Sequence, residues 1–165
     1  RVLRDAAHAL AEKLGALTFD RIAAIPYAAL PIGTAIALEM DRPMIYPRQA
    51  KKDYGTERVI EGEFSAGETA VVIDDVITTG ASKVEAIAPL VAAGLSVRDV
   101  VVLVDREQGG AAEMSARGYT LRSVFTIREL LRVLKSAERF SEQQYRQVLT
   151  FLERSERECT NQIYP

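Results

Sequence analysis

The sequence predicts an α/β fold in which helices cover both faces of a mostly parallel central sheet. Short apolar runs alternate with segments of helical periodicity, the pattern of a chain built from right-handed βαβ units. Glycine or proline stands at many boundaries between these segments. The 165 residues are enough for one domain with a sizeable core and too few for two ordinary domains, so we expect a single domain over residues 1–165.

The first part of the chain predicts a helix, a strand, a second helix and a long loop. Gly15 supplies a stop for the first helix, Pro26 ends the first apolar run, and Pro31 stands at the start of the second helix. The loop segment is polar, charged and poor in core residues, so we expect it to be mobile. The expected elements are a helix over 1–14, a strand over 19–25, a helix over 31–40, a brief apolar run at 44–46 and the loop at about 48–62.

The second part predicts two strand, loop and helix units, then a strand and a helical C-terminus. Gly67 makes a turn ahead of the first of these strands. Thr126 with Glu129, and Ser141 with Gln144, each fit a capping box ahead of an amphipathic helix. The expected elements are strands over 68–73, 97–104 and 120–125, a polar loop over 105–110, and helices over 82–93, 111–117, 127–135 and about 142–157.

Composition excludes several classes of protein. Lys and Arg total 21 against 23 Asp and Glu, so no overall positive field favours nucleic acid as a partner. Cys159 and His8 are the single cysteine and histidine, which leaves no disulfide framework and no thiolate or imidazole cluster for structural zinc. The longest uncharged stretch, 22–38, contains Pro26 and Pro31 and is too short for a membrane span. We therefore expect a cytoplasmic protein that binds neither nucleic acid nor membranes.

Unusual loops follow three of the expected strands, after Ile25, Ile73 and Val104. In a parallel sheet the ligand crevice lies beyond the carboxyl ends of the strands, so function should sit in these loops. The strongest candidate is the run from Val71 to Ser82, where an apolar strand leads to two carboxylates and then to hydroxyls, a glycine and a helix.

Each part of this run suits a phosphorylated sugar. Asp74 and Asp75 are adjacent carboxylates, which suit sugar hydroxyls. Gly80 permits close approach, and the backbone N–H groups at the helix start, with hydroxyls beside them, would form a pocket for a phosphate dianion. The alternative is that the two carboxylates merely end a strand and that Thr79 or Ser82 only caps the helix.

The full string, Val71-Val72-Ile73-Asp74-Asp75-Val76-Ile77-Thr78-Thr79-Gly80-Ala81-Ser82, resembles the ribose-phosphate signature of type I phosphoribosyltransferases. These enzymes use 5-phosphoribosyl 1-pyrophosphate (PRPP) as the donor. The resemblance implies that Asp74 and Asp75 are catalytic and hold the ribose 2′ and 3′ hydroxyls. It also implies PRPP contacts for the rest of the signature, with the last five residues wrapped around the 5′-phosphate: Val76, Thr78, Thr79, Gly80, Ala81 and Ser82.

Other segments narrow the acceptor base. Lys51-Lys52-Asp53-Tyr54-Gly55-Thr56 and Asp105-Arg106-Glu107-Gln108-Gly109-Gly110 look like segments of orotate phosphoribosyltransferases. Together with Ile25-Pro26-Tyr27-Ala28-Ala29-Leu30-Pro31, they look most like the orotate-transferring domain of UMP synthases, over about residues 1–153. The resemblance implies the type I phosphoribosyltransferase fold, with a pyrophosphate loop at Pro26, Tyr27 and Ala28.

The resemblance assigns the orotate carboxylate to Arg106, because the family's arginine in this segment faces that group. A guanidinium fork suits a planar carboxylate in a bidentate arrangement. Thr78 would also approach the base. The alternative for Arg106 is a surface salt bridge with Asp105 or Glu107.

The charged loop gathers Arg48, Lys51, Lys52 and Arg58. On composition alone a solvated charge run is favoured. The resemblance instead aligns Lys52 with the family's essential, catalytic loop lysine and Arg48 with a pyrophosphate-binding arginine. In the family's dimers these residues enter the neighbouring subunit's site. The resemblance also implies PRPP contacts for Lys51 and Tyr54 and a homodimer with shared active sites.

The implied reaction is Mg²⁺-dependent transfer of the phosphoribosyl group from PRPP to orotate, in UMP biosynthesis. Its products are orotidine 5′-phosphate and pyrophosphate. We expect no metal ligand directly from the protein, because PRPP would hold the Mg²⁺. Fusion to an orotidine 5′-phosphate decarboxylase domain is also implied. The alternatives are a phosphoribosyltransferase for another base and a non-catalytic module that binds PRPP for regulation.

Two departures from the family's pattern affect these expectations. Gln49 stands where many bacterial relatives have a basic residue, which removes one charge from the pyrophosphate site. The family's N-terminal hood segment, which contributes a lysine and aromatic residues over the orotate ring, has no counterpart ahead of the first helix. We therefore expect this chain to bind PRPP but to turn over slowly or not at all unless the complete protein supplies that segment.

Overall fold

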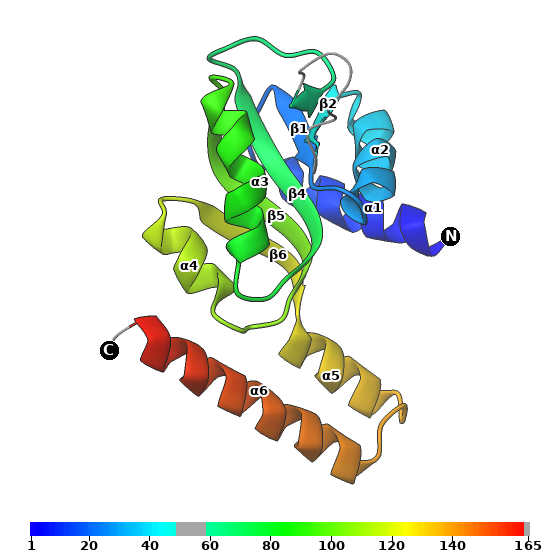
Figure 1. The fold of residues 1–165 in the computed structure, drawn as a ribbon. Helices are drawn as coiled ribbons and strands as arrows, with labels where there is room; N and C mark the ends of the chain where they lie inside the picture. Colours follow the sequence, from blue (N-terminus) through cyan, green and yellow to red (C-terminus); the bar gives the residue numbers. More distant parts are fainter. Residues whose placement is uncertain (49–58, 164–165) are drawn as a thin grey trace.

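A computed structural model describes residues 1–48 and 59–163 of the chain. Its centre is a six-stranded sheet with the strand order β3-β2-β1-β4-β5-β6 (Figure 1). Neighbouring strands are parallel, except that β2 and β3 are antiparallel. The mostly parallel sheet predicted from the sequence is confirmed. The strands are β1 (Arg21–Ala24), β2 (Met44–Pro47), β3 (Ile60–Glu61), β4 (Thr69–Ile77), β5 (Ser96–Asp105) and β6 (Thr120–Thr126).

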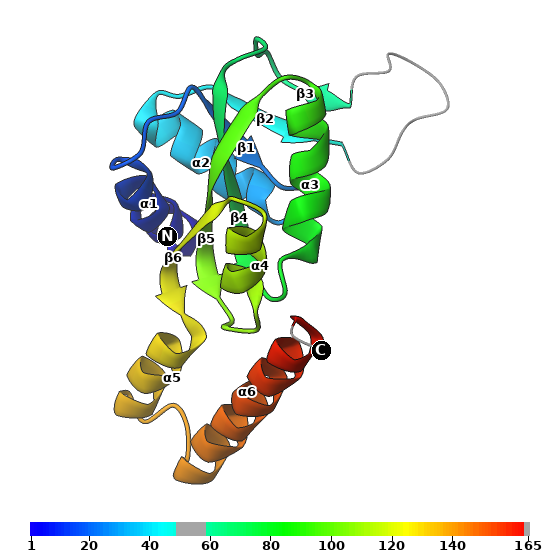
Figure 2. The ribbon, with the colours of Figure 1, turned by 90° about the vertical axis from the view of Figure 1, so that its left-hand side faces the viewer.

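Helices cover both faces of this sheet, as predicted. Successive residues of a strand point to opposite faces, so a continuous apolar strand needs a packing layer on each face. In β4, Val71 and Ile73 pack with Leu10 and other residues of the first two helices, whereas Val72 packs in a second core with Ile87. Figure 2 shows the sheet between these two helical layers. The helices are α1 (Val2–Leu14), α2 (Ala29–Met40), α3 (Ala81–Ala92), α4 (Gly110–Ala116), α5 (Ile127–Ser136) and α6 (Glu142–Ile163).

The strand that carries the two carboxylates is longer than predicted. The expected strand ended at Ile73, but β4 continues through Asp74 and Asp75 to Ile77. The reason is that β5 offers a parallel partner along the whole length, with Asp74 opposite Val102 and Ile77 opposite Asp105. The carboxylates therefore belong to the sheet, and so does Asp105, which the sequence placed in a loop.

The segment expected as a loop at about 48–62 contains a short strand. Ile60 lies opposite Pro47 and is buried, so β3 adds an antiparallel edge to the sheet beside β2. The polar composition of the surrounding segment hid this single core residue. The rest of the predicted loop, 49–58, lies outside the described residues.

The last two helices form a hairpin that extends away from the sheet beyond the end of β6 (Figures 1 and 2). Both predicted capping boxes are confirmed. Glu129 N donates to Thr126 Oγ1 (3.2 Å) while Thr126 N donates to Glu129 Oε2 (2.7 Å), and Ser141 and Gln144 repeat the arrangement at α6. α6 passes its predicted end near 157 and reaches Ile163, because no glycine or proline interrupts it.

Within the described part of the chain, none of the helices combines the length and the apolar character that crossing a membrane demands.

Candidate functional site

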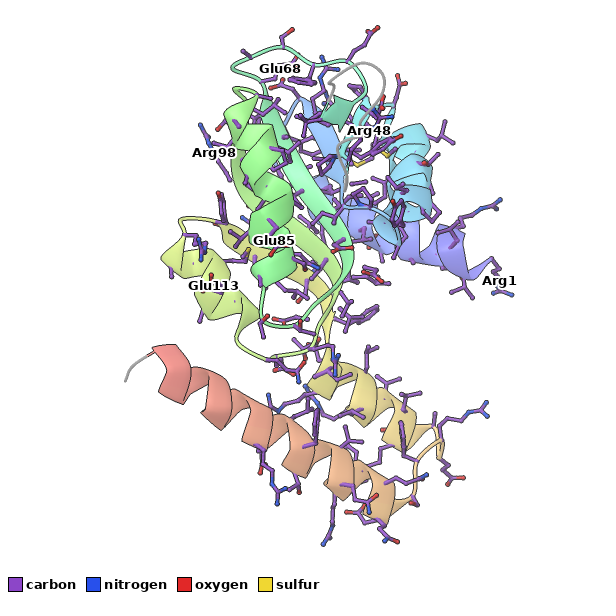
Figure 3. All side chains as sticks on the ribbon, viewed as in Figure 1. Arg1, Arg48, Glu68, Glu85, Arg98 and Glu113 are labelled. Carbon is purple, nitrogen blue, oxygen red and sulfur yellow. The ribbon has the colours of Figure 1, made fainter. Side chains whose placement is uncertain are left out.

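The candidate site is a hollow of about 460 Å³ where β4 approaches the start of α3. It brings together three segments that the sequence singled out independently. The loop after β1 contributes Pro26, Tyr27 and Ala28, the end of β2 leads to Arg48, and β4 contributes Asp74 and Asp75. Ser82 and Glu85 of α3 complete the polar lining. Figure 3 labels Arg48 and Glu85, which come from separate segments of the chain. Of the three loops singled out from the sequence, those after Ile25 and Ile73 meet at this hollow, whereas the loop after Val104 does not line it.

The corner between β4 and α3 is shaped by Gly80. This residue is the N-cap of α3, and its φ of +92° lies in the region that favours glycine. An added Cβ would also lie 3.1 Å from Met114 Cε. Among the described residues no side chain caps α3, so the alternative that Thr79 or Ser82 acts only as a cap is wrong. A helix start with no side-chain cap, flanked by exposed hydroxyls of Thr79 and Ser82, suits a phosphate group.

The two carboxylates have different surroundings. Asp74 is buried, and its Oδ2 lies 2.5 Å from Lys83 Nζ while its Oδ1 accepts a 2.8 Å hydrogen bond from Asp75 N. Burial raises the pKa of Asp74 to about 6, an effect that Lys83 opposes. Asp75 is half-buried, and its Oδ1 accepts a 2.8 Å hydrogen bond from Val76 N.

Lys83 was missed by the sequence reasoning. It lies in the first turn of α3 and is 5% exposed, with Ile87 and Leu90 buried on the same helix. The signal was present, since 83, 87 and 90 follow the helical spacing of a buried stripe. A lysine at the first position of such a stripe, close to a strand that ends in carboxylates, indicates a buried ion pair.

Arg106 lies in the loop after β5, next to the corner. Its backbone N donates to Ile77 O (3.0 Å), and Gly110 approaches so closely that an added Cβ would lie 2.6 Å from Thr78 O. Thr78 and Arg106 are half-buried and do not line the hollow itself, so the predicted base contacts lie beside the predicted sugar contacts.

The predicted alternative for Arg106 is wrong for the described residues, where it forms no ion pair with either acidic neighbour. Asp105 Oδ1 instead accepts a hydrogen bond from Glu107 N (2.8 Å). The Glu107 carboxylate turns toward α5, where Oε2 accepts from Arg128 N (3.1 Å) and Oε1 lies 3.2 Å from Arg128 Nη1. Both acidic side chains thus hold the loop in place.

The predicted pyrophosphate contacts are described in part. Arg48 N donates to Val59 O (2.8 Å), and its Nε lies 2.9 Å from Glu61 Oε1, which orients the guanidinium beside the hollow. Tyr27 is largely exposed, and the peptide bond between Pro26 and Tyr27 is cis. The other predicted residues of the charged loop lie outside the described residues: Gln49, Lys51, Lys52, Tyr54 and Arg58.

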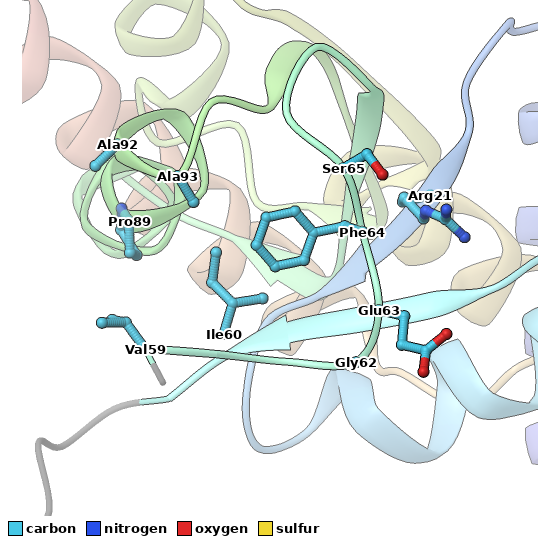
Figure 4. Close-up of a pocket in the computed structure, with 10 residues that line it drawn as sticks. All are labelled: Arg21, Val59, Ile60, Gly62, Glu63, Phe64, Ser65, Pro89, Ala92 and Ala93. Carbon is cyan, nitrogen blue, oxygen red and sulfur yellow. The ribbon is translucent and has the colours of Figure 1, made fainter. Parts of the chain in front are cut away.

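A second hollow, of about 840 Å³, shares Pro89 of α3 with the first (Figure 4). Phe64, Ile60 and Pro89 give it an apolar wall. Its one arginine, Arg21, stands at the start of β1, away from the carboxyl edge, and forms bidentate hydrogen bonds of 2.6 and 2.7 Å with Glu68. It contains no adjacent carboxylates and no open helix start among the described residues, so the smaller hollow is the better candidate for a phosphorylated ligand.

The described part of the chain holds no group of three or more His, Cys, Asp or Glu side chains placed to bind a metal ion. The two carboxylates would be the natural oxygen donors for Mg²⁺. Both Asp74 oxygens and one Asp75 oxygen already accept hydrogen bonds or an ion pair from the chain.

Comparisons with known proteins give consistent matches, although none of the family models compared with the chain matches it. The chain is 46% identical over 129 residues to the bifunctional enzyme PyrF/PyrE of a Nostoc species, covering 78% of this chain and 27% of that protein. It is 40% identical over 129 residues to the orotate phosphoribosyltransferase of Natronomonas pharaonis, covering 78% of this chain and 73% of the relative. Among solved structures, UMP synthase of Leishmania donovani is similar with a TM-score of 0.86 at 42% identity, over 93% of this chain and 33% of that one. The chain thus spans about a quarter of the bifunctional relative and most of the single-function one.

Proposed function

The chain belongs to the orotate phosphoribosyltransferase family, and from this premise we propose that it transfers the phosphoribosyl group of PRPP to orotate. The products would be orotidine 5′-phosphate and pyrophosphate, in the synthesis of UMP. One observation supports this most: the pyrophosphate loop, Arg48 and the two carboxylates of β4 line one hollow at the carboxyl edge of the sheet. Three segments distant in sequence would each contact a different part of one donor.

We propose that the donor's sugar and 5′-phosphate bind along the corner from β4 to α3. Asp74 and Asp75 would accept hydrogen bonds from the ribose hydroxyls. The 5′-phosphate would lie at the start of α3, where backbone N–H groups and the hydroxyls of Thr78, Thr79 and Ser82 surround it. The helix dipole and the backbone N–H groups at the start of α3 favour binding of a phosphate dianion without a direct contact from lysine or arginine.

The base would lie beside the sugar, at the loop after β5. Arg106 would bind the orotate carboxylate, and Thr78 would approach the ring from the neighbouring strand. The loop geometry supports this role, because Asp105 and Glu107 are engaged elsewhere and leave the guanidinium unpaired by them. A bidentate contact with a planar carboxylate would select orotate over bases that lack that group.

Catalysis must stabilise opposite charges as the C1′ bond to pyrophosphate breaks. The sugar becomes cationic and would be stabilised by the nearby carboxylates, while Arg48 would stabilise the departing phosphates. From the sequence we propose that Lys51, Lys52 and Tyr54 add to the pyrophosphate contacts. Mg²⁺ bound to the donor's own oxygens would neutralise part of the pyrophosphate charge.

We further propose a homodimer in which the charged loop of one subunit serves the site of the other, and a cytoplasmic location. Fusion to an orotidine 5′-phosphate decarboxylase domain is supported by the bifunctional relatives.

The test is a pyrophosphate-release assay with PRPP, Mg²⁺ and orotate. We expect release to depend on orotate and to fall roughly 10²- to 10³-fold in Asp75→Asn, because one preorganised charge contact is lost. Donor binding is measured in parallel by calorimetry, since the donor contacts come from the described corner and do not depend on turnover. Release with a purine or uracil but not orotate would assign another base. Donor binding with no release, on a chain that also carries the hood segment, would indicate a non-catalytic module.

A further inference from the structure

Lys83 occupies a buried position where a lysine does not favour the stability of the fold. It is 5% exposed and lies in the first turn of α3, where the positive end of the helix dipole disfavours a cation. Burying an ammonium group also costs free energy unless it is paired. Apolar residues of similar volume often replace buried ion pairs with no loss of stability. The lysine therefore calls for an explanation in the site rather than in the core.

The partner of Lys83 is one of the two carboxylates of the candidate site. Lys83 Nζ lies 2.5 Å from Asp74 Oδ2 and 3.4 Å from Ser82 Oγ. The ammonium group approaches Asp74 from α3, on the face of the sheet that carries Val72. The other Asp74 oxygen accepts a hydrogen bond from Asp75 N (2.8 Å). Two contacts from different elements therefore fix the plane of this carboxylate.

Resting on the proposed function, we propose that Lys83 is a positioning residue that keeps Asp74 ionised and correctly oriented to receive the ribose hydroxyls. Lys83 acts through Asp74 and does not touch the donor itself, because it does not line the hollow. A neutral Asp74 would offer one acceptor oxygen fewer and no negative charge to the cationic sugar. The ion pair thus prepares the site before the donor arrives.

The surroundings of Asp74 show why it needs this help. Tyr27, Arg48, Asp75 and Glu85 share the hollow with it, yet within the described residues Lys83 is the one group that forms an ion pair with it. Burial raises the pKa of Asp74, and the hydrogen bond and charge of Lys83 lower it. Removal of the ammonium group would leave burial and the Asp75 carboxylate opposed only by the hydrogen bond from Asp75 N, so Asp74 would take up a proton at a higher pH.

The experiment replaces the charge and keeps the volume, in Lys83→Met. We expect the acidic limb of the kcat/KM profile for PRPP to move toward higher pH, with a fall of roughly tenfold at pH 7 and recovery near pH 9. Lys83→Arg should restore the wild-type limb. Lys135→Met is the matched control, since it removes a surface lysine that pairs with Glu142 (2.8 Å), and it should leave the profile unchanged.

Two further measurements keep the inference independent of turnover and of folding. Carbon NMR of the Asp74 carboxyl should show a higher pKa in Lys83→Met than in wild type, with no substrate present. In an Asp74→Asn background, Lys83→Met should lower kcat/KM by less than twofold, because its target is gone. This double variant buries no unpaired charge and is expected to fold even where the single variant does not.

Several results would overturn the inference. One is an unchanged Asp74 titration, and another is a loss of kcat/KM by the same factor at every pH, which indicates a purely structural lysine. A raised KM for PRPP that persists at pH 9 would mean that Lys83 contacts the donor directly. If a chain that also carries the hood segment releases no pyrophosphate with orotate, the proposed function fails, while the carboxyl titration still tests the role of Lys83.

Discussion

At Arg106, a substitution by lysine tests whether orotate recognition needs the planar guanidinium or only a positive charge. We predict that Arg106→Lys raises the KM for orotate roughly 10- to 100-fold, because lysine cannot form the two parallel hydrogen bonds to a carboxylate. The KM for PRPP should stay within about twofold, since the donor lies at the neighbouring corner. Steady-state kinetics with each substrate varied in turn measures both effects.

Arg98→Lys is the matched control for this prediction. Arg98 is exposed on the same strand, β5, but near its amino end (Figure 3). It should leave both KM values unchanged. An Arg106→Lys variant with normal orotate kinetics would assign the base carboxylate to another residue.

The sequence identified residues by motif more readily than by environment. Asp74, Asp75 and Gly80 could be predicted because their order along the chain carries the pattern. The spacing of Lys83 with Ile87 and Leu90 indicates a buried position, but its pairing with Asp74 could not be predicted, since that contact joins a strand and a helix that pack only in the folded chain. The same holds for Glu107, whose carboxylate bonds with Arg128 of α5.

At the level of elements, the site depends on the tight packing of α4 against the end of β4. We predict that Gly110→Ala destabilises the fold by about 1–3 kcal/mol, because its Cβ would lie 2.6 Å from Thr78 O and 2.7 Å from Ile77 Cγ1. Relief of this clash would displace Thr78, so kcat/KM should fall as well. Chemical denaturation and the pyrophosphate assay report the two effects separately.

Gly15→Ala provides the control for a glycine with room for a methyl group. Gly15 has φ −58° and its nearest neighbours to an added Cβ are at 3.5 Å. The free energy of unfolding of the Gly15→Ala variant should be unchanged or slightly raised. Equal losses at the two glycines would contradict the packing argument.

Element types were predictable where periodicity was strong, and element ends were not. β4 extends past Ile73 because β5 supplies hydrogen-bonding partners as far as Asp105, which no local pattern in β4 reveals. β3 depends on one buried residue, Ile60, and on pairing with β2. Capping boxes gave accurate starts for α5 and α6, since both partners lie within one turn of the sequence.

For the whole molecule, the proposed shared site can be tested by mixing two inactive variants. Lys52→Ala removes the predicted loop lysine, and Asp75→Asn damages the sugar contact. If each site draws on both subunits, a randomised 1:1 mixture should recover roughly a quarter of wild-type activity, because half of the dimers then contain one intact site. The pyrophosphate assay after subunit exchange measures this recovery.

The control mixes Asp74→Asn with Asp75→Asn. Each site takes both carboxylates from β4 of one subunit. Every site in a mixed dimer therefore carries one of the two changes, and no recovery is expected. Full inactivity of the Lys52→Ala mixture as well would show that each subunit uses its own loop.

The layered arrangement and the edge where the site forms followed from parallel topology alone. The choice between the two hollows did not follow from topology. The larger one is a poor candidate because its Arg21 is paired with Glu68 and because, among the described residues, it has no adjacent carboxylates. The departure of the α5 and α6 hairpin from the sheet was also beyond sequence reasoning, because amphipathic periodicity does not say which surface a helix meets.

The ladder between β4 and β5 has a thermodynamic consequence for ligand capture. Main-chain pairing on either side of the carboxylates, Ile73 with Val101 and Val76 with Val104, immobilises this stretch before any sugar arrives. The conformational entropy of that backbone is already lost during folding. Ligand binding therefore does not have to order it, and the affinity is not lowered by that cost. Amide exchange across 74–77 should therefore be slow in the free protein and change little when ribose 5-phosphate is added.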